Sequence, residues 1–343
     1  MTKVKTSTKV NAEPAAPFTP FTSAYEEFNE SARIYRPELL RKPVKRLYER
    51  ISDICTVRTG IRYEEKQYDI DADLEFGNYN PYEREEVDPE IGARVLRTYF
   101  GSVWRWFDPN KFYKTKLGSR FTKGEALTRT EIVRLMLTIL SAKLGDNLRK
   151  VIWSAKHVKG GKTSAKLFDG WDTVTANEIA GGGISVANKN LYEFKEAITN
   201  INAVDQLKAF CRAASDDLMD EEHVNLIVPK YIYHAYNEDY KTTTGAIPYN
   251  REYKQTFIEG FENVFIRPMS EKAGSPYIHL STKENLLVGC NLQGEEETIL
   301  VEKHHPVFLD FFATIFFGTD FRKISADSML VGKLVAAADD DAA

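Results

Sequence analysis

The sequence has 343 residues, 43% of them hydrophobic and 12% aromatic, with a formal net charge of -4. This composition excludes an intrinsically disordered chain. The length is sufficient for two or three packed units, since domains commonly hold about 100–200 residues. No apolar run approaches the ~18–20 residues that span a bilayer, and no apolar segment follows the charged start Met1–Lys5, so neither a membrane span nor a secretory signal is expected.

The cysteines, Cys55, Cys211 and Cys290, lie far apart and are odd in number. This spacing predicts structural thiols in a reduced compartment, and neither a disulfide framework nor a metal knuckle.

The first part of the chain contains a basic segment that is followed by an acidic one. Residues 1–22 are rich in Thr, Pro, Ala and Lys without apolar periodicity, which predicts a mobile arm with order beginning near Tyr25. Residues 37–54 have apolar side chains at helical spacing with Lys and Arg between them, so a basic amphipathic helix is expected, starting near Pro43.

Residues 64–90 are strongly acidic and begin with a strict alternation of apolar and carboxylate side chains over Tyr68–Phe76, which predicts a strand. The Asp-x-Asp-x-Asp spacing resembles a calcium loop, but Leu74 and Asn80 stand where that loop needs Gly and Glu. Turn residues follow at Gly77–Pro81, so we expect a long hairpin-like excursion with little core of its own.

A long helix is predicted next. Thr128–Glu131 fits a capping box, and an apolar stripe from Ile132 to Ile152 follows it. About 26 residues give a helix of roughly 40 Å, which needs other elements along its whole length, and Gly145 could mark a bend.

The stretch KGGKTSAKLFDGW, residues 159–171, contains a Gly-Lys-Thr core. A phosphate-binding loop needs Gly at position 156 and a strand leading in, whereas Lys156 and a helix are found, so we predict a flexible basic connector. Phe168, Gly170 and Trp171 are expected to form an aromatic corner that fills the space beneath the helix end.

The second half of the sequence predicts a unit that contains both helices and strands. Gly181–Gly183 is a candidate pivot, a helix is expected near Asn202, and the strand Val224–Val228 runs into Pro229 and an aromatic helix over Tyr231–Tyr240. Further strands are expected at residues 264–267, 277–280, 286–290, 298–301 and 308–317, before an acidic tail. The predicted class is α+β in at least two units.

The chain shows no local catalytic signature. Its histidines have no ligand spacing, and there is no Gly-x-Ser-x-Gly elbow or Gly-x-Gly-x-x-Gly after a strand. No enzyme activity, cofactor or metal site is predicted. The basic run 149–166 suggests nonspecific contact with nucleic acid as an alternative to a solvated connector.

The order of these elements resembles the major capsid protein of tailed bacteriophages, whose fold is shared with encapsulin shells. Local matches are Val224–Pro229 with its following helix, Gly260–Val264, and Thr282–Asn291, where Asn291 replaces an acidic residue of the family. The resemblance covers roughly residues 25–335. It implies an N-terminal arm and basic helix (1–57), an extended loop (58–110), a peripheral domain with a spine helix (111–187), an axial domain (188–320), and a strand returning to the peripheral domain before the acidic tail (321–343).

The resemblance implies a structural protein that self-assembles, as hexamers and pentamers, into the icosahedral shell enclosing a phage genome. Its implied partners are a separate scaffolding protein, a portal, decoration proteins and, nonspecifically, the packaged DNA, with assembly in the host cytoplasm and no membrane. An encapsulin-like compartment shell and a DNA-binding or DNA-processing protein using the run 149–166 are the alternatives, and an enzyme for a phosphorylated ligand comes third.

In such a shell the acidic excursion would dock on basic surface of an adjacent subunit, because its apolar edge is too narrow to pack alone. The candidate acceptors are the basic helix over Arg33–Arg50 and the run 149–166. The candidate contact residues are Tyr68, Asp69, Ile70, Asp71, Asp73, Leu74, Glu75 and Phe76 in the excursion, and Arg41, Lys45 and Arg46 in the basic helix.

Overall fold

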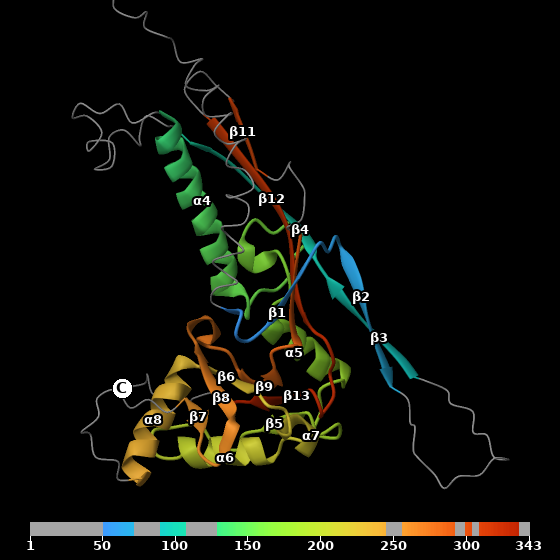
Figure 1. Ribbon diagram of the computed structural model, residues 1–343, viewed down its shortest axis with the longest axis vertical. Coiled ribbons are helices and arrows are strands. Elements are labelled where there is room, and N and C mark those ends of the chain that lie inside the picture. Colours follow the sequence, from blue (N-terminus) through green and yellow to red (C-terminus); the bar gives the residue numbers. More distant parts are fainter. Residues whose placement is uncertain are drawn as a thin grey trace, which may run out of the picture.

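The computed structural model describes residues 51–71, 90–107, 129–244, 256–291, 299–303 and 309–335. These residues form two sheets, a long helix and a two-stranded hairpin that projects from the body (Figure 1). The predicted mixed α+β class is therefore confirmed. The arm, the part of the expected basic helix before Ile51, with Arg41, Lys45 and Arg46, and the capping residue Thr128 lie outside the described residues.

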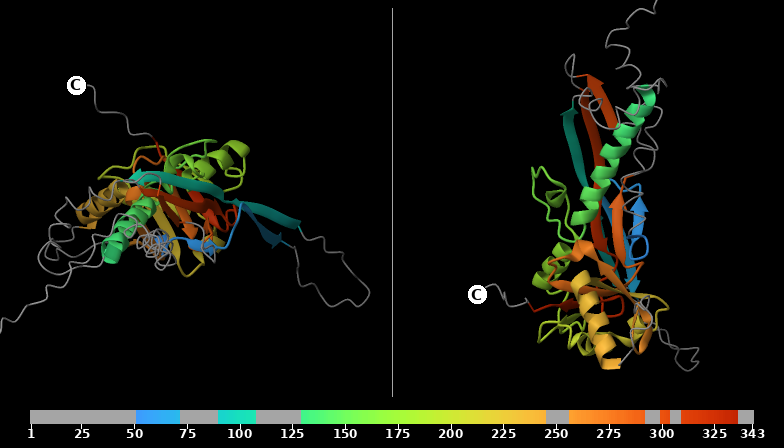
Figure 2. Two further views of the ribbon diagram at one scale, coloured as in Figure 1. Left: turned by 90° about the horizontal axis from the view of Figure 1, so that it is seen from above. Right: turned by 90° about the vertical axis from the view of Figure 1, so that its left-hand side faces the viewer.

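The first sheet is organised around its longest strand. β12 pairs antiparallel with β4 along one edge and with β10 and β11 along the other, and β1 pairs parallel with β10. Helix α4, Arg129–Val151, runs beside this sheet (Figures 1 and 2). The strands are β1 Thr56–Thr59, β4 Tyr99–Phe107, β10 Leu286–Cys290, β11 Ile299–Lys303 and β12 Leu309–Phe321.

The second sheet has six strands in the order β5-β13-β9-β6-β8-β7. Its central strand β6 is buried at all six positions, as expected for a strand with elements on both faces. The strands are β5 Leu191–Glu193, β6 Val224–Pro229, β7 Phe257–Ile258, β8 Phe261–Met269, β9 Tyr277–Thr282 and β13 Met329–Lys333, and the helices are α6 Ala203–Arg212, α7 Asp216–Met219 and α8 Lys230–Thr244.

This second sheet separates two hydrophobic cores. On β6, Leu226 and Val228 pack with helices α6 and α8, while Ile227 faces the core that holds the end of α4 and the aromatic corner. Side chains alternate between the faces of a strand, so each core receives every second residue.

The strand pairing groups segments that the resemblance assigns to different units. β4 falls in the segment expected as extended loop, and β10 and β12 fall in the expected axial segment, yet all three belong to the sheet beside α4. Of the last two strands, β12 lies in the sheet beside α4, whereas β13 pairs with β9 and β5 in the second sheet. β13 fits there because Leu330 enters one core and Val331 the other.

The predicted excursion is a hairpin at its described ends. β2, Glu64–Asp71, pairs antiparallel with β3, Glu90–Arg97. The intervening candidates Asp73, Leu74, Glu75 and Phe76 lie outside the described residues.

Helix α4 confirms the predicted long helix, with 23 residues and no break at Gly145. Among its described side chains, only the C-terminal part of the apolar stripe is well covered: Leu148 is buried, and so is Ile152 just beyond the helix, whereas Ile139 is 49% exposed. The expectation of cover along the whole stripe is therefore wrong at Ile139.

The aromatic residues after α4 lie where the sequence predicts a corner. Phe168 and Trp171 are fully buried in the core beneath the helix end. A side chain at Gly170 would overlap the backbone of Trp153, so this position needs glycine. The sequence did not predict helix α5, Trp171–Gly181, which begins at this corner.

Backbone hydrogen bonds join the two ends of the connector between α4 and the aromatic corner. The Lys156 N–H donates to the Ala165 carbonyl at 2.9 Å, and the Val158 N–H donates to the Lys166 carbonyl at 3.1 Å. This corrects the expectation of a flexible connector, because hydrogen bonds across its two ends hold it as a loop.

We expect the Gly-Lys-Thr sequence not to bind nucleotide. A helix leads into the loop and only the short 3-10 turn Ser164–Lys166 leaves it, so the strand and helix that aim backbone N–H groups at phosphates are missing around it. Millimolar ATP should leave the melting temperature of the chain unchanged. A stabilisation that disappears in Lys162→Ala would contradict this prediction.

Candidate assembly surfaces

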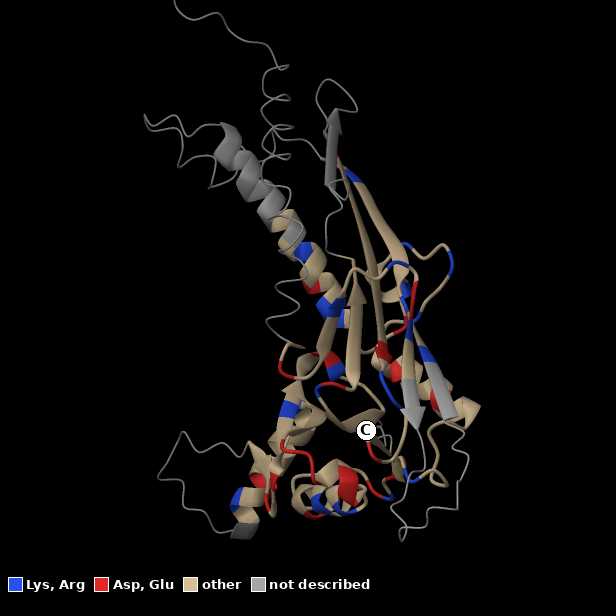
Figure 3. Ribbon diagram, turned by 45° about the vertical axis from the view of Figure 1, so that its right-hand side comes forward, with Lys and Arg blue, Asp and Glu red and all other residues tan. Residues whose placement is uncertain are grey.

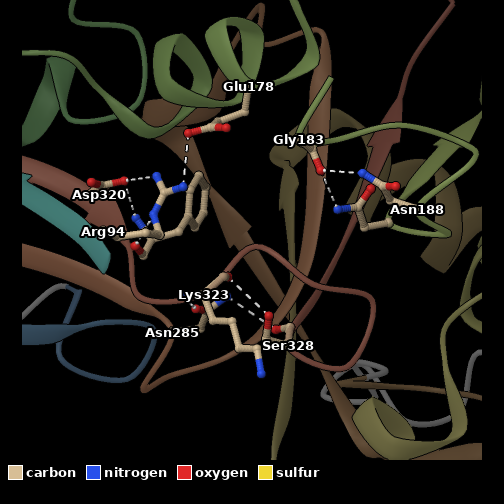
Figure 4. Close-up of polar contacts among 10 residues, drawn as sticks. Arg94, Glu178, Gly183, Asn188, Asn285, Asp320, Lys323 and Ser328 are labelled. Atoms are coloured by element: carbon tan, nitrogen blue, oxygen red, sulfur yellow. Dashed lines mark hydrogen bonds and ion pairs between the residues drawn. The ribbon is translucent and has the colours of Figure 1, made fainter. Parts of the chain in front are cut away.

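The hairpin is fixed to the body at its base by Arg94 of β3 (Figure 4). Its guanidinium donates to Glu178 Oε1 of α5 at 3.0 Å, to Asp320 Oδ1 of β12 at 2.7 Å and to the Phe321 carbonyl at 3.1 Å. Burial alone would lower the pKa of Arg94, but the two carboxylates raise it above its ordinary value, so the guanidinium stays charged. One side chain thus ties the hairpin to a helix and to the central strand.

Close packing supports the same junction. Leu96 is fully buried against Ile61 and Leu287, and a side chain at Gly318 would overlap the Arg97 carbonyl. The hairpin therefore leaves the body at a junction that tolerates little change.

Side-chain hydrogen bonds also close two loops nearby (Figure 4). Asn188 donates to the Gly183 carbonyl at 3.1 Å, and Asn285 Oδ1 accepts from the Lys323 N–H at 2.8 Å. Ser328 donates to the Lys323 carbonyl at 3.1 Å. These bonds satisfy polar groups where the chain turns.

Replacing Arg94 with Met should destabilise the chain by roughly 2–3 kcal/mol, because it keeps most of the apolar stem but leaves two partly buried carboxylates without their cation. Urea unfolding followed by circular dichroism would measure the loss. Arg97→Met is the control: Arg97 pairs with Glu64 at 3.3 Å where both side chains are more than half exposed, and should cost less than about 1 kcal/mol. Equal effects of the two substitutions would contradict the anchoring role of Arg94.

The predicted hairpin residues that the structure describes lie on β2. Tyr68 is 64% exposed, and Asp69, Ile70 and Asp71 complete the strand. Their expected partners in the basic helix lie outside the described residues, so the proposed contact remains a prediction.

The basic run remains largely open to solvent. Arg149 forms an ion pair with Glu271, while Lys150, Lys156, Lys159, Lys162 and Lys166 are exposed. Figure 3 shows Lys and Arg on the last turns of α4 and in the loop beyond it.

A buried polar cluster, which no sequence pattern predicts, joins the second sheet to helix α5 and to the segment after α4. Lys272 Nζ lies 2.8 Å from Asp172 Oδ1 and 3.0 Å from His279 Nδ1, and it stands over the Trp153 ring at 4.1 Å. His279 Nε2 lies 2.9 Å from Thr175 Oγ1. With Nδ1 accepting from the ammonium, His279 is neutral and Nε2 donates to Thr175.

Stability should fall as the pH drops below about 6.5, the ordinary pKa of histidine. Burial and then the charge of Lys272 lower the pKa of His279 well below that value, so the unfolded chain takes up a proton that the folded chain does not. This group's contribution is complete above pH 6.5 and is lost at up to about 1.4 kcal/mol per pH unit below it.

The measurement is urea unfolding at pH 7.5, 6 and 5 for the wild type and for His279→Asn, which cannot titrate. The difference between the unfolding free energies of the two chains gives the pH dependence that is due to this histidine, because the carboxylates contribute equally to both. Parallel pH profiles would contradict the prediction.

Neither a metal site nor a membrane span emerges from the part of the chain that the structure describes. No group of three or more His, Cys, Asp or Glu side chains there could hold a metal ion, and no helix there is long and apolar enough to cross a bilayer. The cysteines are all buried and free, and burial raises the pKa of each thiol to about 12.

Comparison with known proteins gives a likeness in fold only. No family model and no curated protein sequence matches the chain. Among solved structures, a chain of the satellite phage P4 procapsid is 9% identical, with a TM-score of 0.51 over 97% of this chain and 95% of that one. A chain of the cyanophage A-1(L) capsid is 11% identical, with a TM-score of 0.52 over 87% and 94%.

A chain of the capsid of Myoviridae phage XM1 is 7% identical, with a TM-score of 0.53 over 83% of this chain and 91% of that one. All three likenesses span nearly the whole length of the phage chains. The protein therefore has the fold of the capsid proteins of tailed phages.

Proposed function

We propose that this chain is the repeating subunit of an icosahedral shell that encloses a phage genome. The observation that carries the proposal is the likeness to phage capsid chains along almost the full length, 97% of this chain and 95% of the procapsid chain. A fold alone does not fix function, and the projecting hairpin supplies the second support.

An isolated two-stranded hairpin is marginally stable in water. Here the base is tied down by Arg94, while the exposed Tyr68 and the rest of β2 extend away from both sheets (Figure 1). We propose that this hairpin lies on an adjacent copy, with Tyr68, Asp69, Ile70 and Asp71 at the contact and Arg41, Lys45 and Arg46 of the neighbour as the basic partners. Each exposed ion pair would add only about 0.2–1 kcal/mol, so repetition over all copies provides the strength.

In this proposal the sheet beside α4 is the peripheral domain, and the six-stranded sheet with α6, α7 and α8 is the axial domain around the fivefold and sixfold axes. A scaffolding protein, a portal and decoration proteins complete the particle, which assembles in the host cytoplasm. The exposed lysines of the run 149–166 are the candidates for nonspecific contact with packaged DNA.

The test shortens the hairpin without disturbing its base. Tyr68 pairs with Ala93 in the hairpin register, so residues 69–92 can be replaced by an Asn-Gly turn while Arg94 keeps its contacts. We expect a folded subunit that forms no closed shells in electron microscopy and sedimentation. Replacement of residues 159–162 by a Gly/Ser turn of the same length is the control and should leave shells intact. Normal shells from the shortened hairpin would contradict the proposed role.

A further inference from the structure

One face of strand β4 carries large aromatic side chains in contact with solvent. Tyr99 stacks on His157 with ring centroids 4.0 Å apart, and a side chain at Gly101 would touch Leu167, so the odd-numbered residues face the loop after α4. Alternation along the strand turns Phe100, Trp104 and Trp106 to the opposite face. They are 52%, 67% and 62% exposed.

The patch continues to the base of the hairpin. Tyr63, 62% exposed, makes an edge-on contact with Phe316 at 5.0 Å, and Phe100 lies 4.9 Å from the same ring. Tyr63 has a backbone φ of 65°, which is uncommon for a residue other than glycine and is tolerated where the surroundings fix it. Its carbonyl accepts from the Thr98 N–H at 2.7 Å. The ring is thus held on the patch.

We call this surface the aromatic face; it consists of Tyr63, Phe100, Trp104, Trp106 and Phe316. Its size is typical of a contact site. Aromatic side chains of this kind offer about 150–250 Å² each, so the exposed parts amount to about 500 Å². Exposed apolar patches of this size on a single chain are often functional, and a stable interface needs about 800 Å² on each partner.

We propose that the aromatic face is a contact between subunits and is covered by a second copy of this chain. The inference rests on the proposed function and adds a surface to it. The face is continuous with the base of the hairpin, the element proposed to reach an adjacent copy. β4 also lies at the edge of its sheet, since β12 is its one strand partner within the described ranges, and such edges commonly pair or pack with another chain.

The chemistry of the face favours protein over nucleic acid. Trp104 Nε1 donates to Asp310 Oδ2 at 3.2 Å, which places a carboxylate beside the ring. Arg105 points to the other side of the strand by the same alternation. Phosphate groups would meet no cation among the residues that form the face.

Tryptophan fluorescence offers a direct test, because Trp153 and Trp171 are fully buried and Trp104 and Trp106 are exposed. In the hairpin-shortened subunit, acrylamide should quench Trp104 and Trp106 strongly. In assembled wild-type shells the quenching constant should fall several-fold and the emission should shift to the blue. The Trp104→Phe, Trp106→Phe double variant identifies the signal, since it should show little change on assembly.

A second measurement uses assembly itself. The Trp104→Ser, Trp106→Ser double variant should melt close to the wild type but form no closed shells, whereas Val158→Ser, at a position 45% exposed in the loop after α4, should assemble normally. Shells of normal yield from the double variant, or shells in which both rings remain quenchable, would overturn this inference and leave the proposed function standing. A wild-type chain that forms no shells under any condition would instead overturn the proposed function, and the inference with it.

Discussion

Replacing Lys272 with Met should destabilise the chain by about 3–5 kcal/mol, the usual effect of removing one partner of a buried ion pair. The Lys272 side chain is 0% exposed and that of Asp172 is 10% exposed, with 2.8 Å between Nζ and Oδ1. Met fills a similar volume, so the cost comes from the Asp172 carboxylate that stays buried without a cation. Denaturant unfolding at pH 7.5 would measure it.

The matched control is the double variant Lys272→Met, Asp172→Asn. Replacing both members of a buried pair by uncharged groups is often nearly neutral, so the double variant should recover most of the lost stability. If the single variant costs less than about 1 kcal/mol, the value typical of exposed pairs, then Lys272 does not hold the second sheet against helix α5.

Replacing Trp171 with Ala should cost about 3–5 kcal/mol, as large-to-small core substitutions do. The ring is fully buried, lies 4.7 Å from the Trp153 ring and donates from Nε1 to the Asp320 carbonyl at 3.1 Å. The substitution removes packing from the core beneath α4 and leaves that carbonyl without this donor. Thermal and urea unfolding would give the change.

The same substitution at an exposed position supplies the control. Trp104 is 67% exposed and its ring makes one hydrogen bond, to Asp310, so Trp104→Ala should cost no more than about 1.5 kcal/mol, the upper value for one hydrogen bond. Similar losses at the two positions would show that the corner at Trp171 is not part of the core.

Periodicity predicted the elements that have a single clear pattern. β10 was expected at residues 286–290 and has those bounds, and the strand into Pro229 with its aromatic helix is present as β6 and α8. α5 was missed because it opens on the aromatic corner and contains β-branched residues at Thr173, Val174 and Thr175, which favour helix only weakly. β13 is short, and its assignment to a sheet depends on partners far away in the sequence.

The contacts that position the candidate surfaces could not be predicted from the sequence. Arg94 is 84 residues from Glu178 and 226 from Asp320, and Lys272 is 100 residues from Asp172, so no local spacing connects them. The aromatic face could in principle be predicted from the sequence. Phe100, Trp104 and Trp106 are separated by the smaller or polar residues Gly101, Val103 and Arg105 at every second position, a period that predicts a strand, but the resemblance places this segment in an extended loop.

The most direct measurement for the proposed shell is cryo-electron microscopy of the expressed full chain, with mass photometry on the same sample. We expect closed particles of uniform diameter, built from many copies of the 39.1 kDa chain, in which each hairpin lies on an adjacent copy. A chain that stays a monomer or a small oligomer at every concentration and salt condition, alone or with neighbouring gene products, would contradict it.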